Sequence, residues 1–550
     1  MKNLTLFLFI IFVSSLSAQS YFIPKSSERS IVNRGGSTSI TASIPFQGYD
    51  EEEAFFGQGE YEIFLDVVDG ILDNPIIVLD GFDPGDSRDI TGLYNRLEFG
   101  GENLADVVRE EGYDIVILNA PVYSTGGVQI DGGADFIQRN AFVLIELIEF
   151  LNQQKEGDEE LVVLGPSMGG LIAQYALSYM EQNDMEHQTR LFISFDSPHR
   201  GANIPVSLQY LINFLAREFG DETAVAVVEN VLNSAAAKEM LVDHYLGHLA
   251  DGSDTDQDPD KLLPGGAPDF RDAFQSELDA LGFPQNVRNV AMINGSGNGT
   301  STGTSGMQVV STELDLGGSI TADVTLRFTP PASQTNEVTF FEGFLIGVPL
   351  IDFSADSESS SETDGVDAAP GGTSMISSAL GDGQGNQVII DFIEALDQDL
   401  FCFIPTISAL AIENEPNWYA SPDIGGIHNS PFVNFYIPDS NEDHVTVTEE
   451  SAAFALEEIL ETTLGQADLK VPKIVLAQNP IRGPIELQLG QVAGPNVNIR
   501  ILDLSGKLLM NKTILANPGM VRIPHGLNSG MYLLEVNDGR TVKTIKLMVR

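Results

Sequence analysis

A serine stands between two glycines in the segment Gly165-Pro-Ser167-Met-Gly169. Residues 161–164 form an apolar run that predicts a short buried strand, and residues 168–180 carry apolar side chains at helical spacing. A strand, a tight turn and a helix in this order expose the turn serine above a sheet. The chemistry predicted for Ser167 is nucleophilic attack. A glycine-rich turn with an incidental serine is the structural alternative.

The elements around this turn alternate between strands and helices. Strands are expected at residues 74–80, 113–118, 161–164, 191–195, 289–293 and 401–412, and an extended segment at 431–436. Helices are expected at residues 134–153, 168–180 and 449–464. This alternation predicts an α/β fold, with a mostly parallel sheet and helices on both of its faces.

Three motifs resemble those of α/β-hydrolases of the lipase/esterase type. They are Leu-Asp-Gly-Phe at 79–82, the serine turn at 165–169, and Ser-Pro-His-Arg-Gly at 197–201. The resemblance implies an α/β-hydrolase domain over residues 19–465, in which Ser167 belongs to a Ser-His-Asp triad. Two residues depart from the pattern. Asp80 stands where lipases commonly have histidine, and Phe401 stands where an acidic residue of a similar segment would fall.

The same resemblance places the catalytic histidine last, on a loop between the final strand and a terminal helix. His444 fits that place, and His428 is the alternative. A neutral imidazole there can take the proton from Ser167 and return it to the leaving group. The other histidines are expected in a structural turn, a connection, a cap helix and the C-terminal region: His199, His187, His244 with His248, and His525.

The triad acid must be ionised and buried enough to hold the imidazole tautomer. Asp196 directly follows the strand 191–195, where some lipases carry their acid, and it is the preferred candidate. Asp399 is the alternative, and Asp356 and Asp443 are weaker ones. A helix cap or turn is the structural interpretation of Asp196.

A tetrahedral intermediate requires backbone N–H donors aimed at its oxyanion. Met168, the residue after the nucleophile, is expected to supply one of them. By analogy, Phe82 supplies the other from the loop after the first buried strand.

Two insertions interrupt the hydrolase pattern. Residues 203–285 are expected to form a helical cap or lid, and 207–219 carry an apolar stripe. That stripe fits either a lid presented to a lipid or acyl chain, or a cap packed permanently on the core. Residues 295–399 are expected to be β-rich and partly of low complexity, with a disordered or mobile loop over 354–385.

An acidic loop at 251–260 contains five aspartates. Calcium prefers several carboxylate oxygens on such a loop, which makes Asp254, Asp256 and Asp258 candidate ligands of a structural calcium ion. The spacing lacks the glycine and closing glutamate of an EF-hand, and a solvated acidic loop is the alternative. No cofactor is expected to be required.

The N-terminus predicts export. Residues 1–18 have one lysine, an apolar core and small residues ending at Ala18, a pattern typical of a secretory signal peptide. No later segment is apolar for long enough to cross a bilayer. Cys402 is the only cysteine, which excludes an intramolecular disulfide framework.

Residues 471–550 differ in composition, with ten lysines and arginines against four aspartates and glutamates. Short alternating segments separated by glycine turns predict a small β-sandwich. Gln478-Asn-Pro480, the segment 501–507 and the segment 527–532 resemble the type A C-terminal sorting domain of the Bacteroidota type IX secretion system. This implies that the secretion machinery is a partner and that the protein is secreted or displayed at the cell surface. A carbohydrate-binding or spacer sandwich is the alternative.

The net charge of −51 argues against nucleic-acid and anionic-membrane partners. The leading hypothesis is a secreted serine carboxylester hydrolase acting on lipid or other acyl esters. An acyltransferase or polyester depolymerase using the same triad is one alternative. A non-catalytic surface binding protein or adhesin on a degenerate hydrolase fold is the other.

Overall fold

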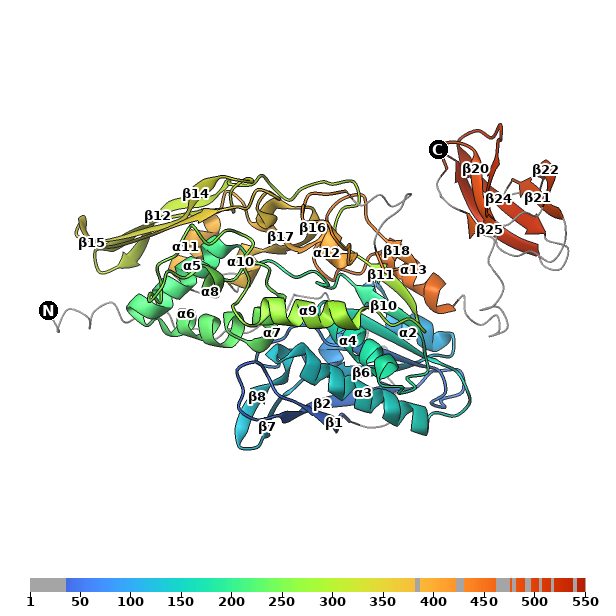
Figure 1. Ribbon diagram of the computed structural model, residues 1–550, viewed down its shortest axis with the longest axis horizontal. Coiled ribbons are helices and arrows are strands. Elements are labelled where there is room, and N and C mark those ends of the chain that lie inside the picture. The colour runs from blue at the N-terminus through green and yellow to red at the C-terminus, as the bar shows by residue number, and fades with distance from the viewer. Residues whose placement is uncertain are drawn as a thin grey trace. The chain divides into compact units, whose positions relative to one another are not determined.

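The computed structural model describes residues 36–380, 386–421, 430–460, 475–476, 481–489, 496–503, 507–515, 519–537 and 542–549. It contains two compact units, of which the first ends at Ile459 and the second comprises the C-terminal residues from Leu460 (Figure 1). The predicted signal peptide at 1–18 and the alternative base His428 lie outside the described residues.

An eight-stranded sheet forms the centre of the first unit, in the order β1-β2-β6-β3-β9-β10-β11-β18. The strands are β1 (Thr38–Phe46), β2 (Phe55–Phe64), β6 (Asp114–Asn119), β3 (Pro75–Leu79), β9 (Leu161–Pro166), β10 (Thr189–Phe195), β11 (Arg288–Met292) and β18 (Asn434–Tyr436). The last six run parallel, whereas β1 pairs antiparallel with β2, and β2 with β6. The predicted mostly parallel sheet is confirmed, and the antiparallel edge adds two strands that the sequence analysis did not identify.

The central strands are buried along their whole length. Every residue of β3 and β6, and all of β9 except Pro166, are buried. Strands of this kind are continuous apolar runs because both faces of the sheet are covered. The helices α3 (Ile137–Gln154) and α4 (Met168–Gln182) pack against each other, and α3 also packs on β1 and β2.

The first insertion is helical, as expected, and its apolar stripe is covered. Its helices include α5 (Val206–Phe214), α6 (Glu222–Val227), α7 (Ala235–Met240), α8 (Tyr245–His248) and α9 (Arg271–Leu281). Leu208 and Leu211 of α5 are buried. The Phe214 ring stacks on Phe353 with ring centroids 4.4 Å apart. In this structure, the stripe therefore lies in packed core.

The second insertion contains a four-stranded antiparallel sheet in the order β12-β13-β14-β15. These strands are β12 (Gln308–Gly317), β13 (Ile320–Arg327), β14 (Thr335–Leu345) and β15 (Val348–Glu358). The sheet packs on α5, and the Thr339 hydroxyl donates a hydrogen bond to the Ser207 carbonyl at 2.9 Å. Figure 1 shows this sheet extending to one end of the first unit.

Two local predictions in this region are wrong. The segment 401–412 is not a central strand, because β17 (Leu400–Pro405) pairs with β16 (Gly371–Met375) in a separate two-stranded sheet and α12 (Thr406–Ala409) follows. Residues 354–380 are not a disordered loop, since β15, β16 and α10 (Ile376–Ala379) occupy much of them. Polar side chains of this segment are paired with residues far away in the sequence: buried Asp367 accepts hydrogen bonds from the Asn203 amide and the Thr329 N–H.

The second unit is a β-sandwich, as predicted. One sheet is β19 (Val475–Leu476), β20 (Ile485–Leu489) and β23 (Gly519–Ile523). The other is β22 (Leu508–Leu515), β21 (Asn496–Leu502), β24 (Gly530–Asn537) and β25 (Val542–Val549). Alternate residues of both sheets form one apolar core, which includes Ile485, Leu487, Ile499, Ile501 and Leu534.

We expect Phe353→Ala to lower the free energy of unfolding of the first unit by about 3 kcal/mol, because it removes a buried ring that joins the four-stranded sheet to α5. Phe56→Ala, at a ring that is 43% exposed, is the control and should cost about 1 kcal/mol or less. Urea unfolding followed by circular dichroism provides the measurement. Equal losses in the two variants would contradict the packing described for α5.

Candidate active site

Ser167 lies at a sharp bend between β9 and α4. Its backbone has φ 54° and ψ −128°, a conformation that non-glycine residues rarely adopt. Its N–H donates a hydrogen bond to the Phe195 carbonyl at 2.8 Å, which joins the bend to β10. A Cβ atom at Gly165 would lie 2.5 Å from the Gly169 carbonyl oxygen. The glycines are therefore required for α4 to begin directly against the strand.

The structure brings together three of the residues identified from the sequence. His444 Nε2 lies 2.9 Å from Ser167 Oγ, and His444 Nδ1 lies 2.7 Å from Asp196 Oδ2. An ionised carboxylate only accepts hydrogen bonds, so Nδ1–H donates to Asp196 and Nε2 is left to accept the Ser167 proton. The Asp196 side chain is fully buried, whereas the His444 side chain is 12% exposed. The arrangement forms a continuous hydrogen-bonded chain from a buried carboxylate to the serine.

Asp196 is held on both of its oxygens. Oδ1 accepts a hydrogen bond from the Asn294 N–H at 3.0 Å, and Oδ2 accepts the one from His444. The Asp196 N–H donates to the Met292 carbonyl at 2.7 Å, across to the neighbouring strand β11. A Cβ atom at Gly372 would lie 2.1 Å from Oδ2, so only glycine fits beside the acid.

His444 is positioned by the pair formed by β16, in the second insertion, and β17, which follows that insertion. Its N–H donates to the Thr373 carbonyl at 2.9 Å, and its ring meets the Phe403 ring edge-on with centroids 4.8 Å apart. The Thr373 hydroxyl donates to Asp443 Oδ1 at 2.9 Å, which ties the base loop to β16 a second time. Sequence reasoning missed Asn294, Gly372, Thr373 and Phe403, because their roles arise from contacts between segments distant in the sequence.

The alternative acids have other partners. Asp399 accepts hydrogen bonds from the N–H and the hydroxyl of Ser377, at the start of α10. Asp443 binds Thr373, as described above. Asp356 lies on β15, opposite Glu337 of β14.

His199 is fully enclosed between the Ser194 hydroxyl and the Gln174 side chain, each 2.7 Å from a ring nitrogen. Burial lowers the pKa of His199 to about 3, so that the ring is neutral at physiological pH. His187 Nδ1 accepts a hydrogen bond from the Thr189 N–H. The rings of His244 and His248 donate to the carbonyls of Leu232 and Lys261. His525 belongs to the second unit, where it contacts the Gly483 carbonyl.

The loop that follows β3 lies directly against the serine. A Cβ atom at Gly81 would lie 3.1 Å from Ser167 Cβ and 3.6 Å from Oγ. Phe82 is the next residue of this loop. Met168 is the first residue of α4, and N–H groups in the first turn of a helix have no partner within it. Both expected oxyanion donors thus belong to segments that border Ser167.

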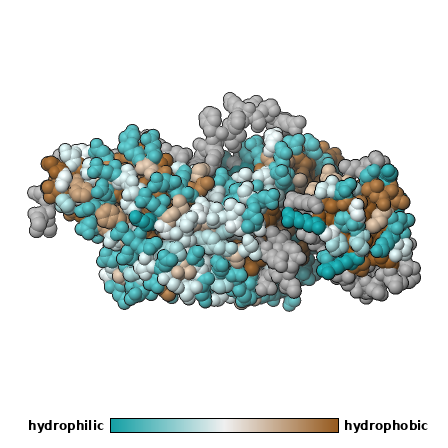
Figure 2. Space-filling view, turned by 90° about the horizontal axis from the view of Figure 1, so that it is seen from above, coloured by the Kyte–Doolittle hydropathy of each residue, from teal (hydrophilic) through white to brown (hydrophobic). Residues whose placement is uncertain are grey.

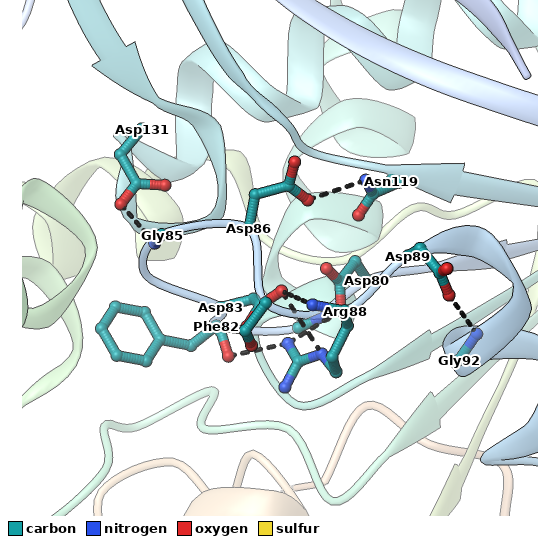
Figure 3. Close-up of polar contacts among 12 residues, drawn as sticks. Asp80, Phe82, Asp83, Gly85, Asp86, Arg88, Asp89, Gly92, Asn119 and Asp131 are labelled. Atoms are coloured by element: carbon teal, nitrogen blue, oxygen red, sulfur yellow. Dashed lines mark hydrogen bonds and ion pairs between the residues drawn. The ribbon is translucent and has the colours of Figure 1, made fainter. Parts of the chain in front are cut away.

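Arg88 fixes this loop, and the contacts explain the aspartate at position 80 (Figure 3). Its Nη2 donates to Asp80 Oδ1 at 2.9 Å and to the Phe82 carbonyl at 2.8 Å. Asp80 Oδ1 also accepts the Gly81 N–H at 2.7 Å, and Asp83 Oδ2 accepts the Arg88 N–H at 2.8 Å. Figure 3 shows the Phe82 ring directed away from these polar contacts. An ion pair takes the place that histidine commonly holds in lipases.

The predicted calcium ligands lie in the acidic loop at 251–260. Among the residues that the structure describes, no group of three or more histidine, cysteine, aspartate or glutamate side chains is arranged to hold a metal ion. The structure thus does not bring Asp254, Asp256 and Asp258 together as ligands. The loop is organised by its own hydrogen bonds: Ser253 Oγ accepts the Asp256 N–H at 2.8 Å, and Asp258 Oδ1 accepts the Asp260 N–H at 3.0 Å.

Two family models match parts of the chain. Residues 479–550 match the "Secretion system C-terminal sorting domain", and residues 122–218 match the family described as "Putative serine esterase (DUF676)". The second match includes both Ser167 and Asp196. No curated protein matches the chain.

Solved structures of bacterial lipases and esterases show a distant likeness. The propeptide form of Bacillus licheniformis lipase BlEst2 is 11% identical, with a TM-score of 0.32, over 88% of this chain and 76% of that one. Its mature form is 13% identical, with a TM-score of 0.24, over 43% and 72%. Est1E from Butyrivibrio proteoclasticus is 10% identical, with a TM-score of 0.23, over 46% and 77%. The fold assignment therefore rests on the sheet order and the serine bend.

The first unit has an α/β-hydrolase fold, and residues 479–550 match a C-terminal sorting domain. The sorting domain marks the protein as one that is exported, to the cell surface or beyond it. Within the described ranges, no helix is long and apolar enough to cross a membrane.

We expect Arg88→Met to lower kcat/KM for a soluble ester by about tenfold to a hundredfold, because the Phe82 backbone loses its tether beside Ser167. A positioning role predicts a fall mainly in kcat with KM little changed. Arg88→Lys is the matched control and should retain more activity than Arg88→Met, since an ammonium can still bridge Asp80 and the carbonyl. Equal activity in wild type and Arg88→Met would contradict the role of this contact.

Asp80 also predicts a pH dependence of stability. Burial raises the pKa of Asp80 from its ordinary value of 3.8 to about 6, against the lowering effect of Arg88. Because the folded-state pKa lies above the unfolded value, this group costs stability as the pH rises from about 4 to about 6. The wild type should lose about 2 kcal/mol relative to Asp80→Asn between pH 4 and pH 7 in urea unfolding. A difference that does not change with pH would contradict this ionisation.

Proposed function

We propose that the protein is an exported serine carboxylester hydrolase, which cleaves acyl esters through an acyl-enzyme. The observation that carries the proposal is the chain of hydrogen bonds from Asp196 through His444 to Ser167. The match of residues 122–218 to a serine esterase family supports it independently, since that match rests on sequence and not on the geometry.

In the proposed first step, Ser167 Oγ attacks the ester carbonyl carbon while His444 Nε2 takes its proton. The carbonyl oxygen becomes an oxyanion and accepts hydrogen bonds from the N–H groups of Met168 and Phe82. As the intermediate collapses, the bond to the alkoxide breaks and His444 returns the proton to that leaving oxygen. The acyl group remains on Ser167.

In the second step, a water molecule attacks the acyl-enzyme and gives its proton to the same imidazole nitrogen. The carboxylic acid leaves, and Ser167 regains its proton from His444. Asp196 keeps the imidazole in one tautomer and stabilises its charged form in both steps. Its complete burial strengthens that interaction, because the charges are little screened by water. The backbone donor at Asn294 keeps the carboxylate in place.

A catalytic role is favoured over a binding protein on a degenerate fold. The departure at Phe401 would matter only if the acid came from that segment, and Asp196 already occupies the position beside His444. A binding protein also has no need for the strained backbone of Ser167, which places the hydroxyl beside the imidazole.

Hydrolysis of p-nitrophenyl butyrate tests the proposal. We expect Ser167→Ala and His444→Ala to lower kcat by at least about a thousandfold, and Asp196→Asn by about 10⁴-fold, because the wrong tautomer then faces the serine. Asp399→Asn is the matched control for the acid and should keep most of the activity. Loss of activity in Asp399→Asn with retention in Asp196→Asn would overturn the assignment of the acid. Full activity in Ser167→Ala would overturn the proposed nucleophile.

A further inference from the structure

The hairpin of β14 and β15 ends in an exposed apolar tip. Ile346, in the turn, is 79% exposed, the highest value among the large apolar residues that the structure describes. Val348 is 61% exposed and Leu350 is 49% exposed. Figure 2 shows hydrophobic residues at the left end of the molecule, the end at which Figure 1 places this hairpin. We call Phe344, Leu345, Ile346, Val348 and Leu350 the apolar tip.

The turn residue of this tip does not suit the backbone that it occupies. Ile346 has φ 51° and Gly347 has φ 71°, so both residues of the two-residue turn are left-handed. Such turns favour Asn-Gly or Asp-Gly, and a β-branched residue at positive φ is a steric outlier. The Ile346 side chain therefore does not stabilise the fold, either through burial or through the geometry of the turn. A strained and exposed apolar side chain indicates a function outside folding.

The apolar tip has no charged residue, whereas a row of acidic residues crosses the sheet next to it. Residues 343–351 contain no charged side chain. Beneath them, Glu313, Asp323, Glu342 and Asp352 are paired partners in register across all four strands. Like charges directly opposite one another cost stability in a sheet, so this row is not explained by folding either. From Glu342 to Ile346 the strand rises by about 13 Å, at about 3.3 Å per residue.

The sheet that carries the tip is packed on α5. The insertion to which it belongs begins at the same edge of the central sheet as the candidate site. The four-stranded sheet packs on α5 through Phe353 and Phe214 and through the Thr339 hydroxyl. The chain enters this insertion from the carboxyl end of β11. Ser167 and Asp196 follow the carboxyl ends of the parallel strands β9 and β10, at the same edge.

We propose that the apolar tip inserts into a neutral or zwitterionic lipid surface and so holds the protein at its ester substrate. This inference rests on the proposed function. It specifies the substrate class of the hydrolase as lipid esters in an aggregated lipid phase. A convex tip offers no groove for a peptide, whereas it can enter the boundary between head groups and acyl chains, which lies within about 5–10 Å of the surface. The acidic row and the net charge of −51 disfavour an anionic surface.

Binding is measured by flotation of the full-length mature chain with phosphatidylcholine vesicles and with a triolein emulsion coated by phosphatidylcholine. The Ser167→Ala background separates binding from hydrolysis. We expect Ile346→Asn to lower the partition coefficient by about tenfold, since it removes a large aliphatic side chain from the lipid. The unfolding midpoint should stay the same or rise, because asparagine suits the left-handed turn. Val68→Asn, at a residue 67% exposed on another loop, is the matched control and should bind like its parent.

Four outcomes would overturn the inference. The first is equal binding by Ile346→Asn and its parent, and the second is no binding by the parent. The third is stronger binding to phosphatidylglycerol vesicles than to phosphatidylcholine. The fourth is self-association in sedimentation that Ile346→Asn abolishes, which would assign the tip to a second copy of the chain.

Hydrolysis of water-soluble p-nitrophenyl butyrate by the wild type keeps the two proposals separable. Activity on this ester without lipid binding overturns the tip inference alone. Inactivity overturns the proposed hydrolase, whatever the flotation result.

Discussion

The bend at Ser167 is the constraint on which the rest of the site depends. A non-glycine residue at φ 54° costs about 1–3 kcal/mol, and the surrounding structure must compensate for it. That compensation comes from β9 and its neighbours: the Ser167 N–H is bonded to β10, and the glycines on both sides let α4 and the β3 loop approach within contact distance. The buried parallel sheet thus fixes the position of the Ser167 hydroxyl.

A second constraint is the buried charge of Asp196. A carboxylate without access to water is stable only when its oxygens are bonded, and here Asn294 and His444 provide those bonds. The β16–β17 pair completes the enclosure, with Gly372 against the acid and Thr373 holding the base loop. The second insertion therefore helps to hold the acid and the base in place. Arg88 holds the loop after β3, on the side of the serine where Phe82 lies, because it joins Asp80 to the Phe82 carbonyl.

Much of this could be predicted from the sequence, because the signals were local. The apolar runs of β3, β6, β9, β10 and β11 and the glycines around Ser167 indicate a parallel sheet with a serine turn without any tertiary information. His444 and Asp196 could be named because the resemblance to lipase/esterase-type hydrolases implies a base and an acid at these points along the chain. The contacts of Asn294, Thr373 and Phe403 could not, since each joins segments separated by tens of residues. The segment 354–380 was misjudged for a related reason: its polar residues are paired with distant partners, which composition does not reveal.

The central claim is that Ser167 is a nucleophile activated by His444 and Asp196. Labelling with a fluorophosphonate probe, followed by peptide mass spectrometry, tests it most directly, because the probe reports an activated serine without requiring the natural ester. The account predicts one adduct on Ser167 in the wild type, a much slower reaction in Asp196→Asn, and none in Ser167→Ala. An adduct on another serine, or the same rate of labelling at Ser167 in wild type and Asp196→Asn, would contradict it.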